Sequence, residues 1–440
     1  MEKPVVIGEG TYGCVHKPTL KCKDNPNVDY TDKISKLMKD KDADIELTEY
    51  DAIDRVDADH QFHLKRPTKC IPKLSPSYLA NCKLLDKSDL TQLRLLIMED
   101  GGQDLAKFVA SKPQKEDAEN AIIQFHNVCQ GLLVLHDNGM IHHDLKPQNV
   151  VFNKIKRVMN FIDFGYMTTR QRILHDSRAS MNGHTIPHWS FPPEAPLLNK
   201  SFYEDVVRLR STDIQRTTEL IWTKYVKPHT IQLLKVVFIN EQDGLEILYE
   251  QFTDFIKTGC IAGNYERILN RSTLTIDVFG IGLTLLFFVG RIRRHLTKTL
   301  QKQLVDLCWS ALNFNVLKRI TISTFITLYE RILTDSGLLV QHGYEIQNHK
   351  LSEIAEPVVA EPVVAEPVID RCGSNKELNP RTNRCTKRCK SGYDRDDKFV
   401  CRKACLEGKE RNPTTNRCVQ RCKENEIRNA KFRCTKKKRA

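Results

Sequence analysis

The spacing of hydrophobic positions changes about a quarter of the way along this 440-residue chain. In residues 1–100 short apolar runs alternate with turn residues, and segments 5–7, 30–38 and 93–98 have the length and composition of strands. Residues 44–55 are expected to form a short helix. From residue 117 onwards apolar residues recur at steps of three and four, which is typical of amphipathic helices. The pattern predicts an α+β fold, with a small β-rich lobe followed by a larger α-rich lobe.

Two later segments define the predicted domain organisation. The mostly apolar run at 278–290 has 13 residues, which is shorter than the roughly 20 residues a membrane span needs, so we expect a buried core helix and no membrane span. Residues 356–370 repeat a Glu-Pro-Val motif every five residues, which favours an extended linker. We therefore predict a domain over residues 1–350, a linker over 351–370 and a separate tail over 371–440.

The tail is a tandem duplication of cysteine-rich sequence. Four cysteine pairs share the same 33-residue offset: Cys372 and Cys405, Cys385 and Cys418, Cys389 and Cys422, and Cys401 and Cys434. So short a repeat cannot form a normal apolar core, and a cross-link is therefore expected. In a helix the C-x3-C spacing would place two sulfurs on one face, and both disulfides and a zinc site remain open, with reduced thiols as a third alternative.

Charge and the other cysteines separate the tail from the rest of the chain. Residues 371–440 hold 23 Lys and Arg against 8 Asp and Glu, whereas the whole chain carries +13, so the charges of the part before residue 371 sum to −2. An acidic or polyanionic partner should therefore bind the tail. The seven cysteines outside the tail are irregularly spaced, and we expect them to be free, reduced thiols: Cys14, Cys22, Cys70, Cys82, Cys129, Cys260 and Cys308.

A glycine-rich segment follows the first predicted strand. Its residues are Gly8, Glu9, Gly10, Thr11, Tyr12, Gly13, Cys14 and Val15. A dinucleotide-binding loop of this type should open a helix, but the following residues have the pattern of a strand. A glycine-rich hairpin that folds over the phosphates of a nucleotide fits better, because glycine lets backbone amides approach phosphate oxygens closely.

Three further positions would complete a nucleotide site. Lys36, on the third predicted strand, is our choice to contact the phosphates, with Lys33 as the alternative. A glutamate on the next helix should hold this lysine, and Glu49 fits by spacing, with Glu46 one turn earlier as the alternative. Residues 98 and 99 end a buried strand, so the backbone of Met98 and Glu99 could bind an adenine edge at a hinge between the lobes.

The segment His-His-Asp-Leu-Lys-Pro-Gln-Asn at 142–149, followed by Asp-Phe-Gly at 163–165, carries the chemistry. Asp144 would accept or orient the proton of an attacking hydroxyl group, and Lys146 would neutralise charge on a transferred γ-phosphoryl group. Asn149 and Asp163 would be ligands of Mg²⁺. These residue types in this order predict phosphoryl transfer from ATP.

Residues 1–335 resemble the eukaryotic-type protein kinase superfamily. Lys146 and the proline after it are similar to the serine/threonine version of the catalytic loop. The Ser-Lys-Leu-Met strand at 35–38 and the Pro-Pro-Glu segment at 192–194 look like kinases of large cytoplasmic DNA viruses, insect iridoviruses especially, and the tail is similar to their cysteine adaptor repeats. The resemblance implies ATP with Mg²⁺ or Mn²⁺, protein substrates, and a location in the host cytoplasm or the virion.

The same resemblance implies two structural contacts and exposes two departures. Glu194 should pair with Arg319, and a buried helix beginning near Asp277 should anchor the catalytic loop. His143 replaces the arginine that usually meets a phosphorylated activation-loop residue, so activity without such phosphorylation is expected. The stretch between Glu194 and Asp277 is unusually long, and we interpret it as packing rather than as a substrate-docking element.

A different class of function remains open alongside catalysis. A pseudokinase or virion scaffold would act through the basic tail alone. Pseudokinases usually lack Lys36, Asp144 or Asp163, and this chain keeps all three.

Overall fold

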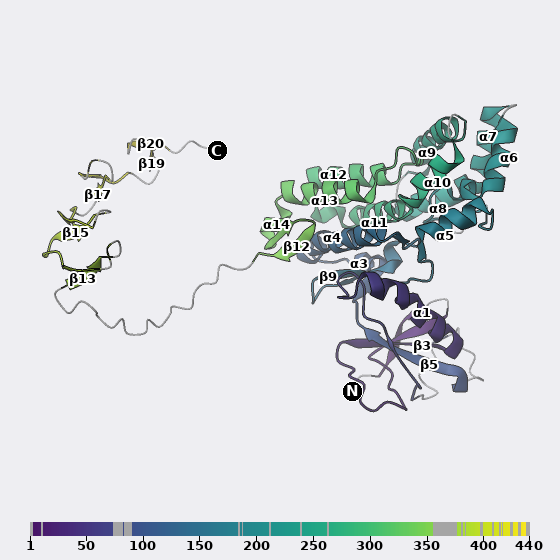
Figure 1. Cartoon of the computed structure of the whole chain (residues 1–440), viewed down its shortest axis with the longest axis horizontal. Coiled ribbons are helices and arrows are strands. Elements are labelled where there is room, and N and C mark those ends of the chain that lie inside the picture. The colour runs from purple at the N-terminus through teal and green to yellow at the C-terminus, as the bar shows by residue number, and fades with distance from the viewer. Residues whose placement is uncertain are drawn as a thin grey trace. The chain divides into compact units, whose positions relative to one another are not determined.

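The computed structural model divides the chain into two units, Met1–Ile354 and Ala355–Ala440 (Figure 1). In the first unit it describes residues 3–9, 12–73, 82, 90–183, 185–186, 188–210, 213–237, 240–261 and 264–354. In the second it describes residues 376–379, 382, 384–396, 399–406, 409–412, 415, 417–422, 426–429 and 433–436. The first unit ends a little after the predicted boundary at residue 350. Most of the predicted linker, and Cys372, lie outside the described residues.

An antiparallel sheet of five strands forms the first lobe, in the order β1-β2-β3-β5-β4. Its strands are β1 (Val5–Glu9), β2 (Gly13–Lys17), β3 (Lys33–Lys39), β4 (Thr68–Cys70) and β5 (Leu93–Glu99). Gly13, at the start of β2, pairs with Met38 of β3, and a Cβ atom on Gly13 would lie 2.4 Å from the carbonyl oxygen of Leu37. The strand predicted from residue 30 begins at Lys33, because Tyr30 to Asp32 form a turn in which Asp32 has φ +51°.

Helix α1 (Asp40–Val56) follows β3 without a loop. It begins four residues before the predicted start at residue 44. Asp40 and Asp42 lie in its first turn, where carboxylates interact favourably with the helix dipole. Tyr50 and Ile53 are buried against the second lobe, so α1 connects the sheet to the helical part of the unit.

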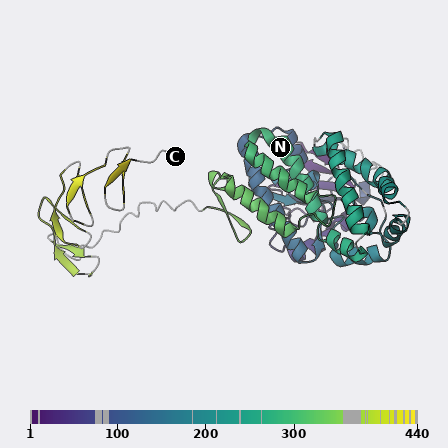
Figure 2. The ribbon, with the colours of Figure 1, turned by 90° about the horizontal axis from the view of Figure 1, so that it is seen from above.

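The second lobe packs around two long helices, α4 (Lys115–Asp137) and α11 (Ile276–Ile292). Helix α12 (Lys298–Ala311) packs on α11, and α13 (Ile322–Asp335) packs on α4 (Figures 1 and 2). The apolar run at 278–290 is buried over almost its whole length, which confirms the predicted core helix. No single described helix has the length and apolar composition of a membrane span; residues 265–273 and 276–295 satisfy both only as a pair bent by 49°.

Short elements connect these helices and carry the loops between the lobes. The small sheets are β6-β8-β9 and β7-β10, and β11 pairs with β12. Their strands are β6 (Gln103–Asp104), β7 (Met140–Ile141), β8 (Val150–Asn153), β9 (Val158–Phe161), β10 (Thr168–Thr169), β11 (Tyr344–Gln347) and β12 (Lys350–Glu353). The short helices are η1 (Leu90–Gln92), α3 (Leu105–Ala110), η2 (Pro147–Asn149), α5 (Arg170–Arg178), η6 (Arg293–His295) and α14 (Leu338–Gln341).

The long stretch between Glu194 and Asp277 is helical in its described residues. It contains η3 (Ala195–Leu198), α6 (Lys200–Arg210), α7 (Ile214–Ile221), η4 (Trp222–Val226), α8 (Lys227–Val237), α9 (Glu241–Phe255), η5 (Ile256–Ile261) and α10 (Tyr265–Thr273). Six apolar side chains of this stretch are buried in the main core: Leu233, Leu234, Val237, Leu248, Phe252 and Phe255. Phe238 lies outside the described residues, and Ile247 is exposed. The stretch thus contributes to the core, as its interpretation as packing requires.

In its described residues the tail forms β-hairpins and no helix. The pairs are β13 (Lys376–Asn379) with β14 (Arg384–Lys387), β15 (Tyr393–Arg395) with β16 (Cys401–Lys403), β17 (Lys409–Arg411) with β18 (Cys418–Gln420), and β19 (Glu426–Arg428) with β20 (Cys434–Lys436). Disulfides close the last three hairpins: Cys389–Cys401, Cys405–Cys418 and Cys422–Cys434. Of the alternatives for the tail, the structure therefore has disulfides. These six sulfurs are not available as zinc-binding thiolates.

Four of the seven cysteines predicted to be free thiols also form disulfides, so that prediction was wrong for them. Cys14 bonds to Cys82, and Cys22 bonds to Cys70. All four side chains lie in the apolar cluster on one face of the first sheet, with Leu37 and Leu95. The other three, Cys129, Cys260 and Cys308, are free and buried. The prediction failed because irregular spacing in the sequence does not exclude pairing: the fold brings together cysteines that are 48 and 68 residues apart.

Candidate active site

Helix α11 holds the loop from residue 142 to 149 in place through hydrogen bonds to its backbone. The Asp277 carboxylate accepts hydrogen bonds from the backbone N–H groups of His142 and His143, both at 2.8 Å. One turn later, a Cβ atom on Gly280 would lie 2.7 Å from that of Leu145, so only glycine allows this close approach. The predicted anchoring of the loop by this helix is confirmed.

Three polar side chains of this loop are joined in one network. Asp144 is buried, and its Oδ2 accepts hydrogen bonds from Lys146 Nζ at 2.6 Å and from Asn149 Nδ2 at 2.9 Å. Asn149 Nδ2 also donates to the carbonyl oxygen of Asp144 at 2.8 Å. These bonds hold one carboxylate oxygen in place and leave the amide oxygen of Asn149 as the atom that could face a cation.

Asp163 follows strand β9 and is exposed, with its backbone in the left-handed region at φ +70°. The next residue, Phe164, is buried and packs edge-on against Tyr50 of α1, with ring centroids 5.4 Å apart, and against His142 at 5.8 Å. This packing fixes the turn that presents the Asp163 carboxylate. Carboxylate and amide oxygens are the ligands Mg²⁺ prefers, so the donor set of Asp163 and Asn149 fits this ion.

Lys36 forms an ion pair with Glu46, not with Glu49. The choice of Glu49 as its partner was therefore wrong, and the alternative one turn earlier is correct. Because α1 begins directly after β3, the turn that faces Lys36 is the one that carries Glu46. Glu49 is half-buried nearby, and burial, together with the charges of Glu46 and Asp163, raises its pKa to about 7.

The other lysine considered, Lys33, is the first residue of β3. Its Nζ lies 3.5 Å from Glu99 Oε1 at the end of β5, whereas the neighbouring Met98 pairs with Ile34 across the sheet. Met98 and Glu99 thus border the junction between the lobes, where the hinge was predicted. Lys33 is paired there and is not placed beside Glu46.

The glycine-rich segment spans the β1–β2 hairpin, as predicted, although Gly10 and Thr11 lie outside the described residues. Gly8 and Glu9 pair with Val15 and Cys14 across the hairpin, and Tyr12 is largely exposed near its tip. The Cys14 side chain is fully buried in the sheet's apolar cluster, so only its backbone could contact a nucleotide.

A buried ion pair lies at the end of the segment that runs from Asp163 to Glu194. Arg319 donates to Glu194 through Nη1 at 2.7 Å and Nη2 at 2.8 Å, and neither side chain is exposed to solvent. The Ser272 hydroxyl donates to the same carboxylate at 2.9 Å. The predicted pairing of Glu194 with Arg319 is confirmed, and it is a two-point contact.

His143 does not present a cationic group to solvent. Its ring packs on Phe191 with centroids 4.9 Å apart, and burial lowers the pKa of the imidazole. A neutral ring in this position offers no fixed positive charge to a phosphate group.

Known proteins resemble the first part of the chain. The family model "Protein kinase domain" matches residues 1–195. The ovarian-specific serine/threonine-protein kinase Lok of Drosophila melanogaster is 33% identical over 84 residues, which are 19% of this chain and 17% of that protein. Mitogen-activated protein kinase 12 of Danio rerio is 25% identical over 147 residues, 33% of this chain and 38% of that protein.

A third relative is similar over a region of comparable size. Cyclin-dependent kinase B1-1 of Arabidopsis thaliana is 35% identical over 85 residues, 18% of this chain and 28% of that protein. The chain thus spans well under half the length of these relatives. The matching family model, the β-rich first lobe, the helical second lobe and the cluster around Asp144 together identify a protein kinase domain with serine/threonine kinase homologues in the N-terminal part of this chain.

Proposed function

We propose that this chain is an active protein kinase that transfers the γ-phosphoryl group of ATP to serine or threonine hydroxyls of protein substrates. One observation carries the proposal: Asp144, Lys146 and Asn149 form a single hydrogen-bonded network, and Asp277 fixes the backbone beneath them. The ion pair between Lys36 and Glu46 adds a positioned cation from the first lobe. Phosphoryl transfer depends mainly on this kind of placement and charge neutralisation.

Each residue has a separate task in this mechanism. Asp144, held by Asn149, would orient the substrate hydroxyl and accept its proton. Lys146 lies beside that carboxylate and would balance charge on the transferred phosphoryl oxygens. Asp163 and Asn149 would hold Mg²⁺, which supplies charge neutralisation at the phosphates when it is bound.

An ATP-to-protein transfer assay on the purified full-length chain tests the proposal. The Asp163→Ala variant should lose nearly all transfer, whereas Asp137→Ala, at an exposed site on the end of α4, should keep it. Equal transfer by wild type and Asp163→Ala would rule out catalysis by this site. A folded wild-type chain that binds ATP but transfers nothing would favour the pseudokinase or scaffold alternative.

We also propose that activity does not require phosphorylation of the segment after Asp163. The ring of His143 packs on Phe191, and burial lowers its pKa, so it is a poor replacement for an arginine that binds a phosphate group. Treatment of the purified chain with a protein phosphatase should leave its transfer rate unchanged. If this treatment abolishes transfer, the proposal is wrong.

For the tail and the location we propose electrostatic binding of a polyanion and a viral setting. The excess of 23 basic over 8 acidic residues in 371–440 supports binding of a polyanion by the tail.

The resemblance to kinases of large DNA viruses supports the viral setting, with the host cytoplasm or the virion as the location. The disulfides favour the virion, because they persist outside reducing compartments. Mass spectrometry of purified particles should then detect this chain; its absence would contradict the virion as the location and leave the host cytoplasm.

A further inference from the structure

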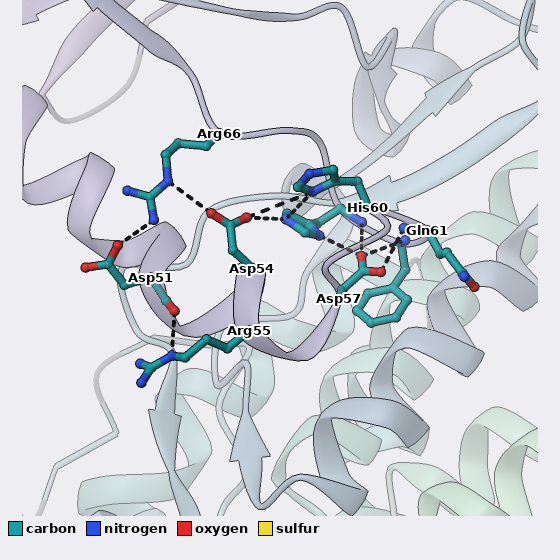
Figure 3. Close-up of polar contacts among 9 residues, drawn as sticks. Asp51, Asp54, Arg55, Asp57, His60, Gln61 and Arg66 are labelled. Carbon is teal, nitrogen blue, oxygen red and sulfur yellow. Dashed lines mark hydrogen bonds and ion pairs between the residues drawn. The ribbon is translucent and has the colours of Figure 1, made fainter.

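Three potential metal ligands meet where helix α1 ends, away from the network of Asp144. Asp54 lies on the last turns of α1, and His60 lies on the loop that leads to β4 (Figure 3). His63 lies on the same loop. Nε2 of His63 lies 3.0 Å from Oδ1 of Asp54 and 3.2 Å from Nδ1 of His60. The third distance, from His60 Nδ1 to Asp54 Oδ1, is 3.9 Å.

Neighbouring residues fix which atoms of Asp54 and His63 are directed at the other potential ligands. Asp57 Oδ2 accepts a hydrogen bond from Nδ1 of His63 at 2.6 Å, so the other ring nitrogen is directed at Asp54 and His60. Arg66 Nε donates to Oδ2 of Asp54 at 3.0 Å, which leaves Oδ1 directed at the histidines. A carboxylate behind a histidine and a partner behind a ligating carboxylate are typical supports of metal ligands.

Asp57 is itself held in place by the backbone. Its carboxylate accepts hydrogen bonds from the N–H groups of Gln61 at 2.8 Å and Phe62 at 3.0 Å. The Asp57 carboxylate, held in this way, fixes the orientation of the His63 ring.

The three ligand atoms have the spacing of a tetrahedral zinc site. Zinc bonds of about 2.0–2.1 Å to nitrogen and oxygen place neighbouring ligand atoms about 3.3 Å apart. Two of the three distances are within a few tenths of an ångström of this value, and the third needs a shift of about 0.5 Å. A single proton on His63 shared with Asp54 would explain one contact, but it gives no reason for His60 to point at the same place.

We propose that Asp54, His60 and His63 bind a divalent transition-metal ion of the zinc class, with a fourth position open to solvent. Asp54 and His60 are partly exposed, so an ion can enter, whereas His63 is fully buried. The ion would tie the end of α1 to the loop before β4. His63 also packs edge-on against Phe164, with ring centroids 5.9 Å apart, so the site adjoins the turn that presents Asp163.

Zinc binding by the full-length, metal-free chain tests this proposal without any measurement of phosphoryl transfer. The titration uses a competing chromogenic chelator, omits reductant so that the disulfides persist, and contains excess Mg²⁺ to occupy the site at Asp163. Wild type should bind one more Zn²⁺ than His60→Ala or Asp54→Asn, and the ion should raise the melting temperature of wild type but not of these two variants. The positioning variant Asp57→Asn should keep the stoichiometry but weaken binding by about 10–100-fold.

The control variant is His175→Ala, which removes an exposed histidine beside Asp176 on α5. It should bind Zn²⁺ as wild type does, because a surface His–Asp pair is not a site. Retention of the full stoichiometry by both His60→Ala and Asp54→Asn would overturn the proposal. So would a wild-type chain that binds no Zn²⁺, since the contact of His63 with Asp54 would then be a shared proton. Co²⁺ substitution gives a further check: a thiolate charge-transfer band would place the ion on cysteines instead.

Discussion

At the scale of single residues, the partner of Lys36 is decided by where helix α1 begins. With no loop after β3, Glu46 faces the lysine, and Glu49 lies one turn further on. We predict that Glu46→Gln lowers kcat of protein phosphorylation on the order of 10²-fold, because a misplaced Lys36 no longer stabilises the phosphates. Glu49→Gln, the matched control, should cost much less. A larger loss from Glu49→Gln, measured by steady-state kinetics, would contradict this assignment.

Glu49 itself predicts a dependence of stability on pH. Burial and the charges of Glu46 and Asp163 raise its pKa from 4.5 to about 7. Between these two values the folded chain binds more protons than the unfolded chain, so this group's contribution to stability is lost as pH rises towards 7. Glu49→Gln stays neutral. It should therefore be more stable than wild type at pH 8, by about 1–2 kcal/mol because the side chain is only half-buried.

Urea unfolding at pH 5 and pH 8 measures this difference. The variant should gain stability relative to wild type only at the higher pH. Glu250→Gln, at an exposed site on α9, serves as the control and should follow wild type at both values. Parallel behaviour of Glu49→Gln and wild type would show that the pKa of Glu49 is not raised.

At the scale of elements, the pair of Glu194 and Arg319 joins the end of the segment from Asp163 to Glu194 to the loop before α13. Both side chains are fully buried, so removing one leaves the other charge without a partner in a low-dielectric interior. We predict that Arg319→Ala lowers the free energy of unfolding by about 3–5 kcal/mol. Arg331→Ala, at an exposed position on α13, should cost less than about 0.5 kcal/mol. Comparable denaturation midpoints for the two variants would contradict a structural role for the pair.

The elements also show what the sequence could and could not predict. Periodicity identified β5, α4 and α11, since each buries one regular face or a continuous apolar run. The strand predicted at 5–7 is also present, as β1, although none of its residues is fully buried. The start of α1 was missed because its first turn is acidic and exposed, with no apolar repeat to mark it. In the site, the sequence motif predicted Asp144, Asn149 and Asp163, and the structure joins the first two by a hydrogen bond. Two glutamates one turn apart could not be ranked without the helix's starting point.

Contacts between distant segments were the least predictable. The sulfurs of Cys14 and Cys82 lie 68 residues apart in the sequence and meet only because the first sheet folds. The cluster of Asp54, His60 and His63 matched no motif, although its Asp-x5-His-x2-His spacing was visible. In the tail the 33-residue period was correct, but the closed units are single hairpins that join cysteines 12 or 13 residues apart.

At the scale of the whole molecule, the two units should differ in their response to reductant. The cysteines of the three disulfides within the described part of the tail are all partly exposed or exposed, and no described tail residue is buried. The cysteines of the two disulfides in the first lobe are buried. Because thiol–disulfide exchange requires access, mild reductant under native conditions should open the tail disulfides first. Mass spectrometry after alkylation should therefore find label in residues 389–434 before it finds any on Cys14, Cys22, Cys70 or Cys82. Simultaneous labelling would contradict the prediction.

The division into two units predicts that catalysis and polyanion binding can be separated. Residues 1–354 have their own core, whereas the tail holds the excess positive charge. Deleting residues 371–440 should leave the melting temperature and phosphoryl transfer of the first unit unchanged. Retention on a heparin column should fall to that of a nearly neutral protein, because retention depends on the number of basic groups that displace counterions. A truncated chain that elutes at the same salt concentration as wild type would place the binding surface in the first unit. The reduced and alkylated full-length chain decides what the hairpins add: unchanged retention would mean that charge alone binds the polyanion, and weaker retention would mean that the disulfide-closed hairpins arrange that charge for it.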